Sequence, residues 1–136
     1  MTQGQHTILI VEDDVRMQQA LKDRLHEEGY RVLVADSVDP GMAILRKEKI
    51  ALILLDLRLD EKSGLTLMDE MREDPAIDHK KIVTVVLTAI ADPAMVADVM
   101  GHGTTDYLVK SDNSLDDIAA FIGKKLAKVE WQISNF

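Results

Sequence analysis

The stretch Ala51-Leu52-Ile53-Leu54-Leu55-Asp56 decides the fold, because five apolar residues run without alternation into a single carboxylate. An apolar run this short is typical of a parallel strand that is buried on both faces. An apolar core would not accept the Asp56 side chain, so we expect the strand to end there. Open α/β sheets place their chemistry at the carboxyl ends of the strands. Asp56 is therefore a candidate functional residue.

Short apolar runs also occupy four other segments, and a helical pattern follows each: residues 7–11, 31–35, 82–87 and 104–109. Asp39-Pro40 and Asp92-Pro93 each predict a helix start, with Asp as the N-cap and Pro at the first helical position. Ser114 and Asp117 resemble a capping box at the start of the last helix. Five strand–helix units predict an α/β protein with a doubly wound parallel sheet of the flavodoxin-like (βα)5 type. The common strand order for five strands is 2-1-3-4-5.

The length of 136 residues suits one domain. We expect residues 1–6 to form a disordered tail and residues 7–136 to form the domain. A net charge of −8 argues against direct nucleic-acid binding, and the absence of Cys excludes disulfides and thiolate metal sites. We find no apolar run that would cross a membrane and no secretory signal, so we expect a cytoplasmic location.

The last helical pattern is longer than the sheet needs. A helix over residues 114–133 would be roughly 30 Å long, whereas a strand of six residues spans about 20 Å. We therefore expect residues 129–136 to overhang the sheet. This end either folds back, or pairs with a partner helix, or begins a linker to an absent output domain.

Residues with reactive side chains stand at the ends of four of the five predicted strands: Glu12 and Asp13, Asp56, Thr88, and Lys110. Each alone has a simpler interpretation, as a helix cap, a strand end or a solvated surface charge. Together they would meet at one edge of a parallel sheet. Three adjacent carboxylates need a compensating cation, and Lys110 and a hard divalent ion could both serve. This combination predicts a phosphoryl-transfer site with an Asp nucleophile.

The ordered motifs ILIVEDD, LILLDLRL, VVLTA and DYLVKS resemble the receiver (REC) domain of two-component response regulators, and the resemblance covers about residues 7–128. It implies that Asp56 accepts the phosphoryl group. It also implies a Mg²⁺ (or Mn²⁺) site and a set of switch residues. The implied roles are Mg²⁺ ligation by Glu12, Asp13, Asp56 and the Arg58 backbone carbonyl, phosphoryl binding by Thr88 and Lys110, a rotamer switch at Tyr107, and a loop glycine at Gly64.

The resemblance further implies the partners of the chain. A histidine kinase or a histidine phosphotransfer protein would supply the phosphoryl group in a bacterial phosphorelay. Phosphorylation would change the surface formed by the fourth helix, the fifth strand and the fifth helix, and a homodimer through this surface is a further expectation. The domain would catalyse its own phosphorylation and dephosphorylation, but it would not be an enzyme acting on other substrates.

The sequence departs from the family pattern near the site. Ser111 follows Lys110 where the family usually has a Pro joined by a cis bond, and a cis bond without Pro costs about 2.5–4 kcal/mol. We expect a trans Lys110–Ser111 bond and a rearranged loop, which leaves the reach of Lys110 open. Asp60 replaces a frequent Pro, and Arg58 and Ile90 are expected to flank the path of the attacking water.

Other classes fit less well. A hydrolase of the haloacid dehalogenase type needs a second Asp at position 58, where this chain has Arg58. A flavodoxin-like electron carrier needs a phosphate-binding loop after the first strand, and that loop is acidic here. A P-loop nucleotidase lacks its Gly-Lys-Ser/Thr motif. A scaffold that works without phosphorylation stays open as an alternative.

Overall fold

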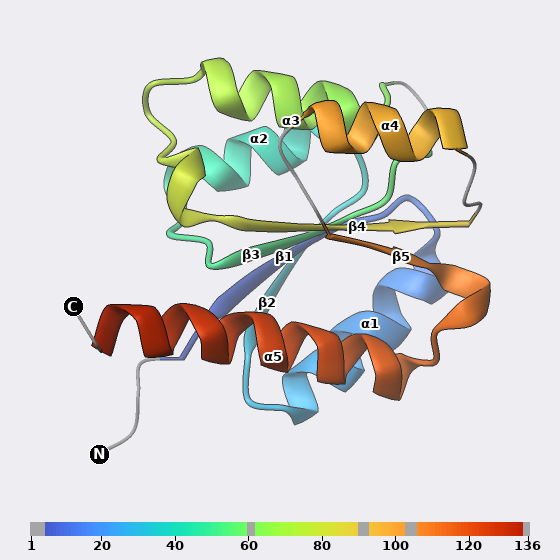
Figure 1. Cartoon of the computed structure of the whole chain (residues 1–136), viewed down its shortest axis with the longest axis vertical. Helices are drawn as coiled ribbons and strands as arrows, with labels where there is room; N and C mark the ends of the chain where they lie inside the picture. Colours follow the sequence, from blue (N-terminus) through green and yellow to red (C-terminus); the bar gives the residue numbers. More distant parts are fainter. Residues whose placement is uncertain (1–4, 60–61, 90–92, 103–105, 135–136) are drawn as a thin grey trace.

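The computed structural model describes residues 5–59, 62–89, 93–102 and 106–134, with side chains described as far as Lys128. The described residues form a sheet of five parallel strands in the order β2-β1-β3-β4-β5, which confirms the predicted fold. Helices α2, α3 and α4 cover one face of the sheet, and α1 and α5 cover the other (Figure 1). The strands are β1 (Thr7–Val11), β2 (Arg31–Ala35), β3 (Leu52–Leu55), β4 (Val83–Thr88) and β5 (Asp106–Val109). The helices are α1 (Val15–Glu27), α2 (Val38–Lys47), α3 (Gly64–Glu73), α4 (Pro93–Gly101) and α5 (Leu115–Ser134), with short 3₁₀ turns η1 (His79–Lys81) and η2 (Lys110–Asp112).

Successive side chains of a strand point to opposite faces of the sheet, so the central strands contribute side chains to two apolar layers, one on each face. Ile53 and Leu55 of β3 pack in the layer beneath α2, α3 and α4. Leu52 and Leu54 pack in the layer beneath α1 and α5. The whole of β3 is buried, as the unbroken apolar run predicts. The only place where this strand can carry a charge is its end.

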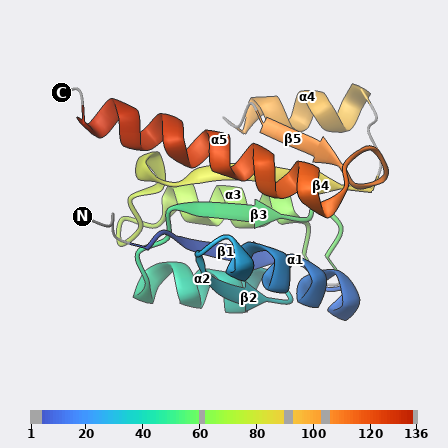
Figure 2. The same cartoon turned by 90° about the horizontal axis from the view of Figure 1, so that it is seen from below.

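The capping box at the start of α5 is confirmed by two reciprocal hydrogen bonds. The Ser114 backbone N–H donates to Asp117 Oδ2 at 2.9 Å, and the Asp117 backbone N–H donates to Ser114 Oγ at 3.0 Å. α5 then continues to Ser134 and runs past the start of β3 (Figures 1 and 2). The side chains after Lys128 lie outside the described part, so the role of residues 129–136 stays a prediction.

The predicted start of α2 at Asp39-Pro40 is wrong. Ser37 is the N-cap and the helix begins at Val38, which is only 1 % exposed. The helix begins two residues before Pro40, because this start places the Val38 side chain in the core. Pro40 still lies in the first turn, where a missing N–H costs no intrahelical hydrogen bond. In the other Asp-Pro pair, Pro93 is the first residue of α4, as predicted, and Asp92 lies outside the described residues.

Within the described residues, no helix combines the length and the apolar character that crossing a bilayer requires.

Candidate functional site

The candidate site lies at the carboxyl edge of the sheet, where β1 and β3 end side by side. Val11 pairs with Leu55, so the next residues, Glu12 and Asp56, leave adjacent strands at the same level. The Asp56 backbone N–H donates to the Val11 carbonyl at 2.9 Å, which extends the ladder to the acid itself. Glu12 is 2 % exposed and Asp56 is 6 % exposed. Two carboxylates are therefore buried next to each other.

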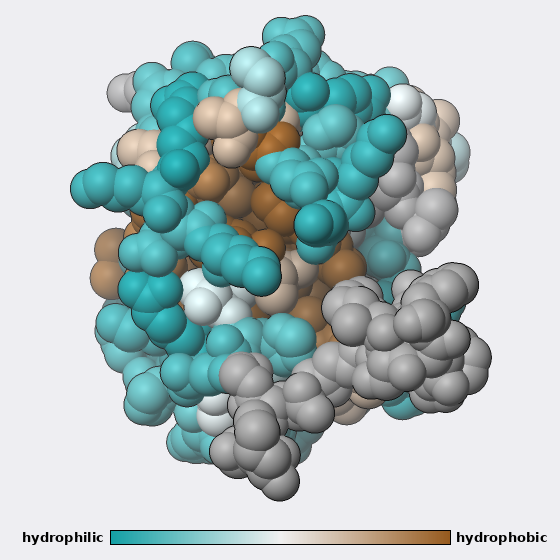
Figure 3. Space-filling view, turned by 90° about the vertical axis from the view of Figure 1, so that its left-hand side faces the viewer, coloured by the Kyte–Doolittle hydropathy of each residue, from teal (hydrophilic) through white to brown (hydrophobic). Residues whose placement is uncertain are grey.

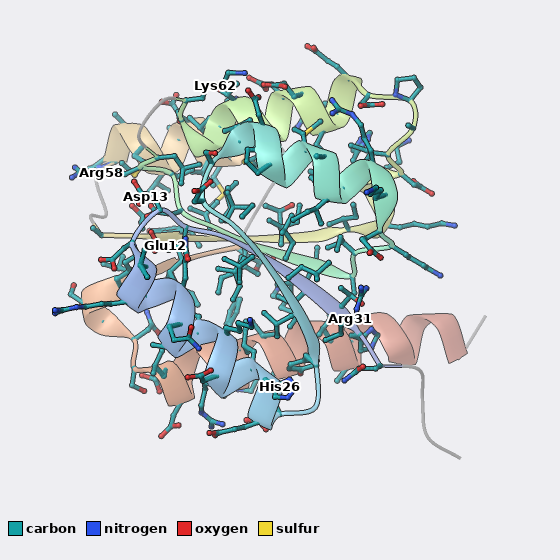
Figure 4. The ribbon with its side chains drawn as sticks, turned by 180° about the vertical axis from the view of Figure 1, so that it is seen from behind. Glu12, Asp13, His26, Arg31, Arg58 and Lys62 are labelled. Carbon is teal, nitrogen blue, oxygen red and sulfur yellow. The ribbon has the colours of Figure 1, made fainter. Side chains whose placement is uncertain are left out.

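Asp13 adds a third carboxylate. Ligand atoms of Glu12, Asp13 and Asp56 all lie within 4.8 Å of one another, and this is the single group of metal-ligand type found among the described residues. Figure 4 shows Glu12, Asp13 and Arg58 at the same end of the sheet. Clustered carboxylate oxygens are the ligands that Mg²⁺ prefers in proteins, so the donor set fits a Mg²⁺ ion.

The loop after β3 is held against Asp56. The Arg58 backbone N–H donates to Asp56 Oδ1 at 2.9 Å, while the Arg58 side chain is exposed. This bond fixes one oxygen of the candidate nucleophile and places the Arg58 peptide beside it. The assignment of the Arg58 carbonyl as a metal ligand stays a prediction.

Lys110 reaches the buried carboxylates. Its Nζ lies 2.6 Å from Glu12 Oε1 and 3.0 Å from Asp56 Oδ2. Lys110 begins the η2 turn, and the described peptide bonds are all trans, which confirms the expected trans bond to Ser111. Partial burial lowers the pKa of Lys110, but its hydrogen bonds to Glu12 and Asp56 outweigh that effect and raise the pKa above its ordinary value. The lysine is therefore charged and shared between two acids.

Glu12 is the residue that this crowding affects most. Burial, followed by its contact with the Asp56 carboxylate, raises the pKa of Glu12 from 4.5 to about 7, although Lys110 and the Asp14 backbone N–H act in the opposite direction. One ammonium group is thus too little positive charge for this cluster at neutral pH. A divalent cation would supply the missing charge.

Gly64 has a steric reason to be glycine. A Cβ atom added there would lie 2.5 Å from the Asp56 carbonyl oxygen and 3.0 Å from Leu57 Cα. Both are backbone atoms that cannot move aside without moving the acid. The Gly64 N–H also donates to the Leu57 carbonyl at 3.0 Å. The first turn of α3 therefore packs directly against the backbone that carries Asp56.

Thr88 and Tyr107 lie on the strands beyond β3. Thr88 is the last residue of β4 and is 1 % exposed, and its hydroxyl donates to Met95 Sδ of α4 at 3.5 Å. Tyr107 of β5 is half-buried opposite Val86 and packs against the layer beneath α2, α3 and α4. Sequence reasoning missed Met95, because a single Met in a helical pattern carries no sign of a polar contact. Ile90 and Asp60 lie outside the described residues.

Comparison with known proteins gives the family to which this fold belongs, a family of signalling domains. The family model for the response regulator receiver domain matches residues 8–122, so the chain belongs to that family. Receiver domains are phosphorylated on an Asp by histidine kinases and bind Mg²⁺ at an acidic pocket.

Two transcriptional regulatory proteins are similar to the chain in sequence. The chain is 33 % identical over 111 residues to the hydrogenase transcriptional regulatory protein HoxA of Cupriavidus necator, covering 81 % of this chain and 22 % of the relative. It is 32 % identical over 118 residues to the transcriptional regulatory protein KdpE of Staphylococcus aureus, covering 87 % of this chain and 48 % of the relative. The chain therefore spans between about a fifth and a half of these relatives.

Among solved structures, a CheY-like response regulator receiver domain protein from Methanospirillum hungatei JF-1 has a TM-score of 0.82 at 26 % identity, covering 95 % of this chain and 99 % of that one. A response regulator receiver protein from Pseudomonas putida has a TM-score of 0.80 at 26 % identity, covering 90 % and 99 %.

Proposed function

We propose that Asp56 is the phosphoryl acceptor of this receiver domain, with Lys110 as the residue that neutralises the transferred group. The observation that carries the proposal is the position of Lys110 Nζ, 2.6 Å from Glu12 and 3.0 Å from Asp56. A lysine held between two buried carboxylates lies where negative charge would increase on phosphorylation. Its own pKa keeps it charged for that purpose.

The transfer conserves atoms and charge. One Asp56 carboxylate oxygen attacks the phosphorus of a phosphohistidine, the new O–P bond forms as the N–P bond breaks, and the electron pair returns to the imidazole. Asp56 Oδ1 already accepts from the Arg58 N–H, and Oδ2 accepts from Lys110. These contacts orient the carboxylate before the donor arrives. Dephosphorylation is a separate later step, in which water attacks the phosphorus, the O–P bond breaks, and the free carboxylate and inorganic phosphate result.

Glu12, Asp13, Asp56 and the Arg58 carbonyl are the residues that would hold Mg²⁺. The ion would supply positive charge to the phosphoryl oxygens and to the carboxylate cluster. The proximity of the three carboxylates and the raised pKa of Glu12 support this part of the proposal.

The response to phosphorylation would begin at Thr88. Its hydroxyl donates to Met95 Sδ, so a turn of Thr88 toward a phosphoryl oxygen would break a contact with α4. Tyr107 would then move into the vacated space. We place the output, and a homodimer, on the α4–β5–α5 surface. A cytoplasmic histidine kinase or histidine phosphotransfer protein is the proposed donor.

The test is incubation with phosphoramidate and Mg²⁺, followed by intact-mass measurement. The wild-type chain should gain one phosphoryl group, and Asp56→Asn should gain none. Asp36→Asn is the matched control, because Asp36 also follows a strand but is exposed, and it should be phosphorylated like wild type. A folded wild-type chain that gains nothing from any donor would favour the phosphorylation-independent scaffold.

A further inference from the structure

A cavity of about 360 Å³ lies at the opposite edge of the sheet from Asp56. It opens between α3, the η1 turn, the beginning of β4 and the residue that follows α4. Its lining residues are Met68, Met71, Arg72, His79, Lys80, Ile82, Thr84 and His102. Thr84 is near the start of β4 and Thr88 is at its end, so the cavity is about 13 Å along the strand from Thr88. The two sites share a strand but no residue.

The floor of the cavity is apolar and adaptable. Met68 and Met71 of α3 are 4 % and 5 % exposed, and Ile82 forms part of the same wall. Figure 3 shows the side of the molecule where β4 begins, and apolar side chains gather there in a hollow framed by hydrophilic ones. Methionine side chains fit ligands of varied shape because they are unbranched and polarizable.

The polar groups of the cavity are all basic or neutral. Arg72, His79, Lys80 and His102 line it, and no described acidic residue does, although the whole chain has a net charge of −8. Clustered basic groups in an acidic protein create a local positive potential that attracts anions. This distribution gives the cavity a preference for negatively charged ligands.

Two of the four basic residues are held by contacts within the protein, and the side chains of the other two are free to contact a ligand. Arg72 donates to the His102 carbonyl, and His102 Nε2 lies 3.2 Å from Asp69 Oδ1. The side chains of His79 and Lys80 form no hydrogen bond or ion pair with the described residues. The wall formed by Arg72 and His102 is therefore held in place, while His79 and Lys80 can donate hydrogen bonds to a ligand.

We propose that this cavity binds a small organic anion, in which a carboxylate or phosphate group is attached to an apolar body. The apolar body would lie on Met68, Met71 and Ile82, and the anionic group would meet Lys80 and His79. The volume falls in the range of pockets for small ligands, which are mostly apolar with a few convergent polar groups. The proposal does not depend on Asp56, because it uses different residues and a different edge of the sheet.

The test uses 1-naphthoate and its neutral analogue 1-naphthamide as probes. Each is titrated into the ¹⁵N-labelled chain while amide shifts are followed by NMR. Naphthoate should shift the amides of residues 71, 72, 79–84 and 102 in a saturable way, and naphthamide should bind about tenfold more weakly, because it lacks a charge-assisted hydrogen bond. Asp56→Asn should bind naphthoate like wild type.

Two charge-reversal variants distinguish binding in the cavity from a general effect of the net charge of the protein. Lys80→Glu should weaken naphthoate binding about tenfold or more. Lys49→Glu changes the same charge at an exposed position outside the cavity lining, and it should leave the affinity unchanged. The proposal is wrong if the cavity amides do not shift, if both probes bind equally, or if both variants weaken binding to the same extent.

Discussion

Charged side chains lie at both edges of the sheet, but the two groups differ in burial and in pairing. At the carboxyl edge, Glu12 and Asp56 are buried and share Lys110. At the amino edge, Lys80 is exposed and unpaired among the described residues. Arg31, labelled at this edge in Figure 4, forms an exposed ion pair with Glu48. Burial makes the first group interdependent, because the two carboxylates share one lysine and removing that lysine leaves both uncompensated. The second group can change with little effect on the rest of the fold.

The largest expected effect comes from the backbone at the carboxyl edge. Gly64→Ala should destabilise the chain by about 3 kcal/mol, because the new Cβ would overlap the Asp56 carbonyl oxygen. Chemical denaturation measures the change. Gly101→Ala is the control: nothing lies within 4 Å of its Cβ position, and it ends α4, so a small stabilisation is expected. Similar losses in both variants would contradict the close packing at Gly64.

Next in size is the loss of a lysine at each edge. Without Mg²⁺ at pH 8, Lys110→Met should destabilise the chain by about 2 kcal/mol or more, because two buried carboxylates lose their cation. Lys80→Met should leave the denaturation midpoint near that of wild type. If the two variants were equally stable, the carboxyl edge would not depend on its lysine.

The pH dependence of stability should separate the edges further. The pKa of Glu12 is raised by folding from 4.5 to about 7, so the native chain retains a proton that the unfolded chain loses. This contribution is fully present below pH 4.5 and is lost as the pH rises through about 7, and about 2 kcal/mol of it is lost between pH 5 and 7. Denaturation curves in EDTA between pH 5 and 8 measure it.

Glu12→Gln is the matched variant for this measurement. It should flatten the slope between pH 5 and 7 and should be more stable than wild type at pH 8 without Mg²⁺. The lowered pKa values of Glu48 and Asp74 lie below this window and do not contribute to it. An unchanged slope in the variant would assign the pH dependence to other groups.

The smallest effect is expected at the exposed pair of the amino edge. Arg31 Nη1 lies 3.1 Å from Glu48 Oε2, and the two side chains are 47 % and 37 % exposed. Solvent and salt screen such a pair, so Glu48→Gln should not shift the denaturation midpoint measurably. A clear shift that disappears in high salt would show that the pair is stronger than its exposure suggests.

The parts of the fold that the sequence predicted are those with local causes. The apolar run before Asp56 identifies a doubly buried strand, and Ser114 with Asp117 marks the start of α5. Parallel strands then bring their carboxyl ends to one edge, so the neighbourhood of Glu12 and Asp56 follows from topology. The start of α2 was misplaced because burial of Val38, a tertiary effect, outweighed the local Asp-Pro signal.

The parts that could not be predicted depend on the path of a side chain in three dimensions. The contact of Lys110 with Glu12 joins residues 98 positions apart across a loop with an unusual Ser111. The Thr88 hydroxyl meets Met95 only because α4 packs where it does. The basic cavity combines residues of α3, η1 and β4 with His102, which follows α4, and no sequence motif joins these positions.

Lys110 lies far from Glu12 and Asp56 in the sequence, and this has a consequence during synthesis of the chain. A chain emerging from the ribosome presents β1 and β3 first, and its N-terminal elements can begin to pair before the last strand exists. At that stage Glu12 and Asp56 can meet without Lys110. The charge balance of the edge is completed when the end of β5 emerges and joins the sheet. A nascent or truncated chain that stops before Lys110 would thus carry the acids without their lysine, and competence to accept a phosphoryl group would mark a chain synthesised past Lys110.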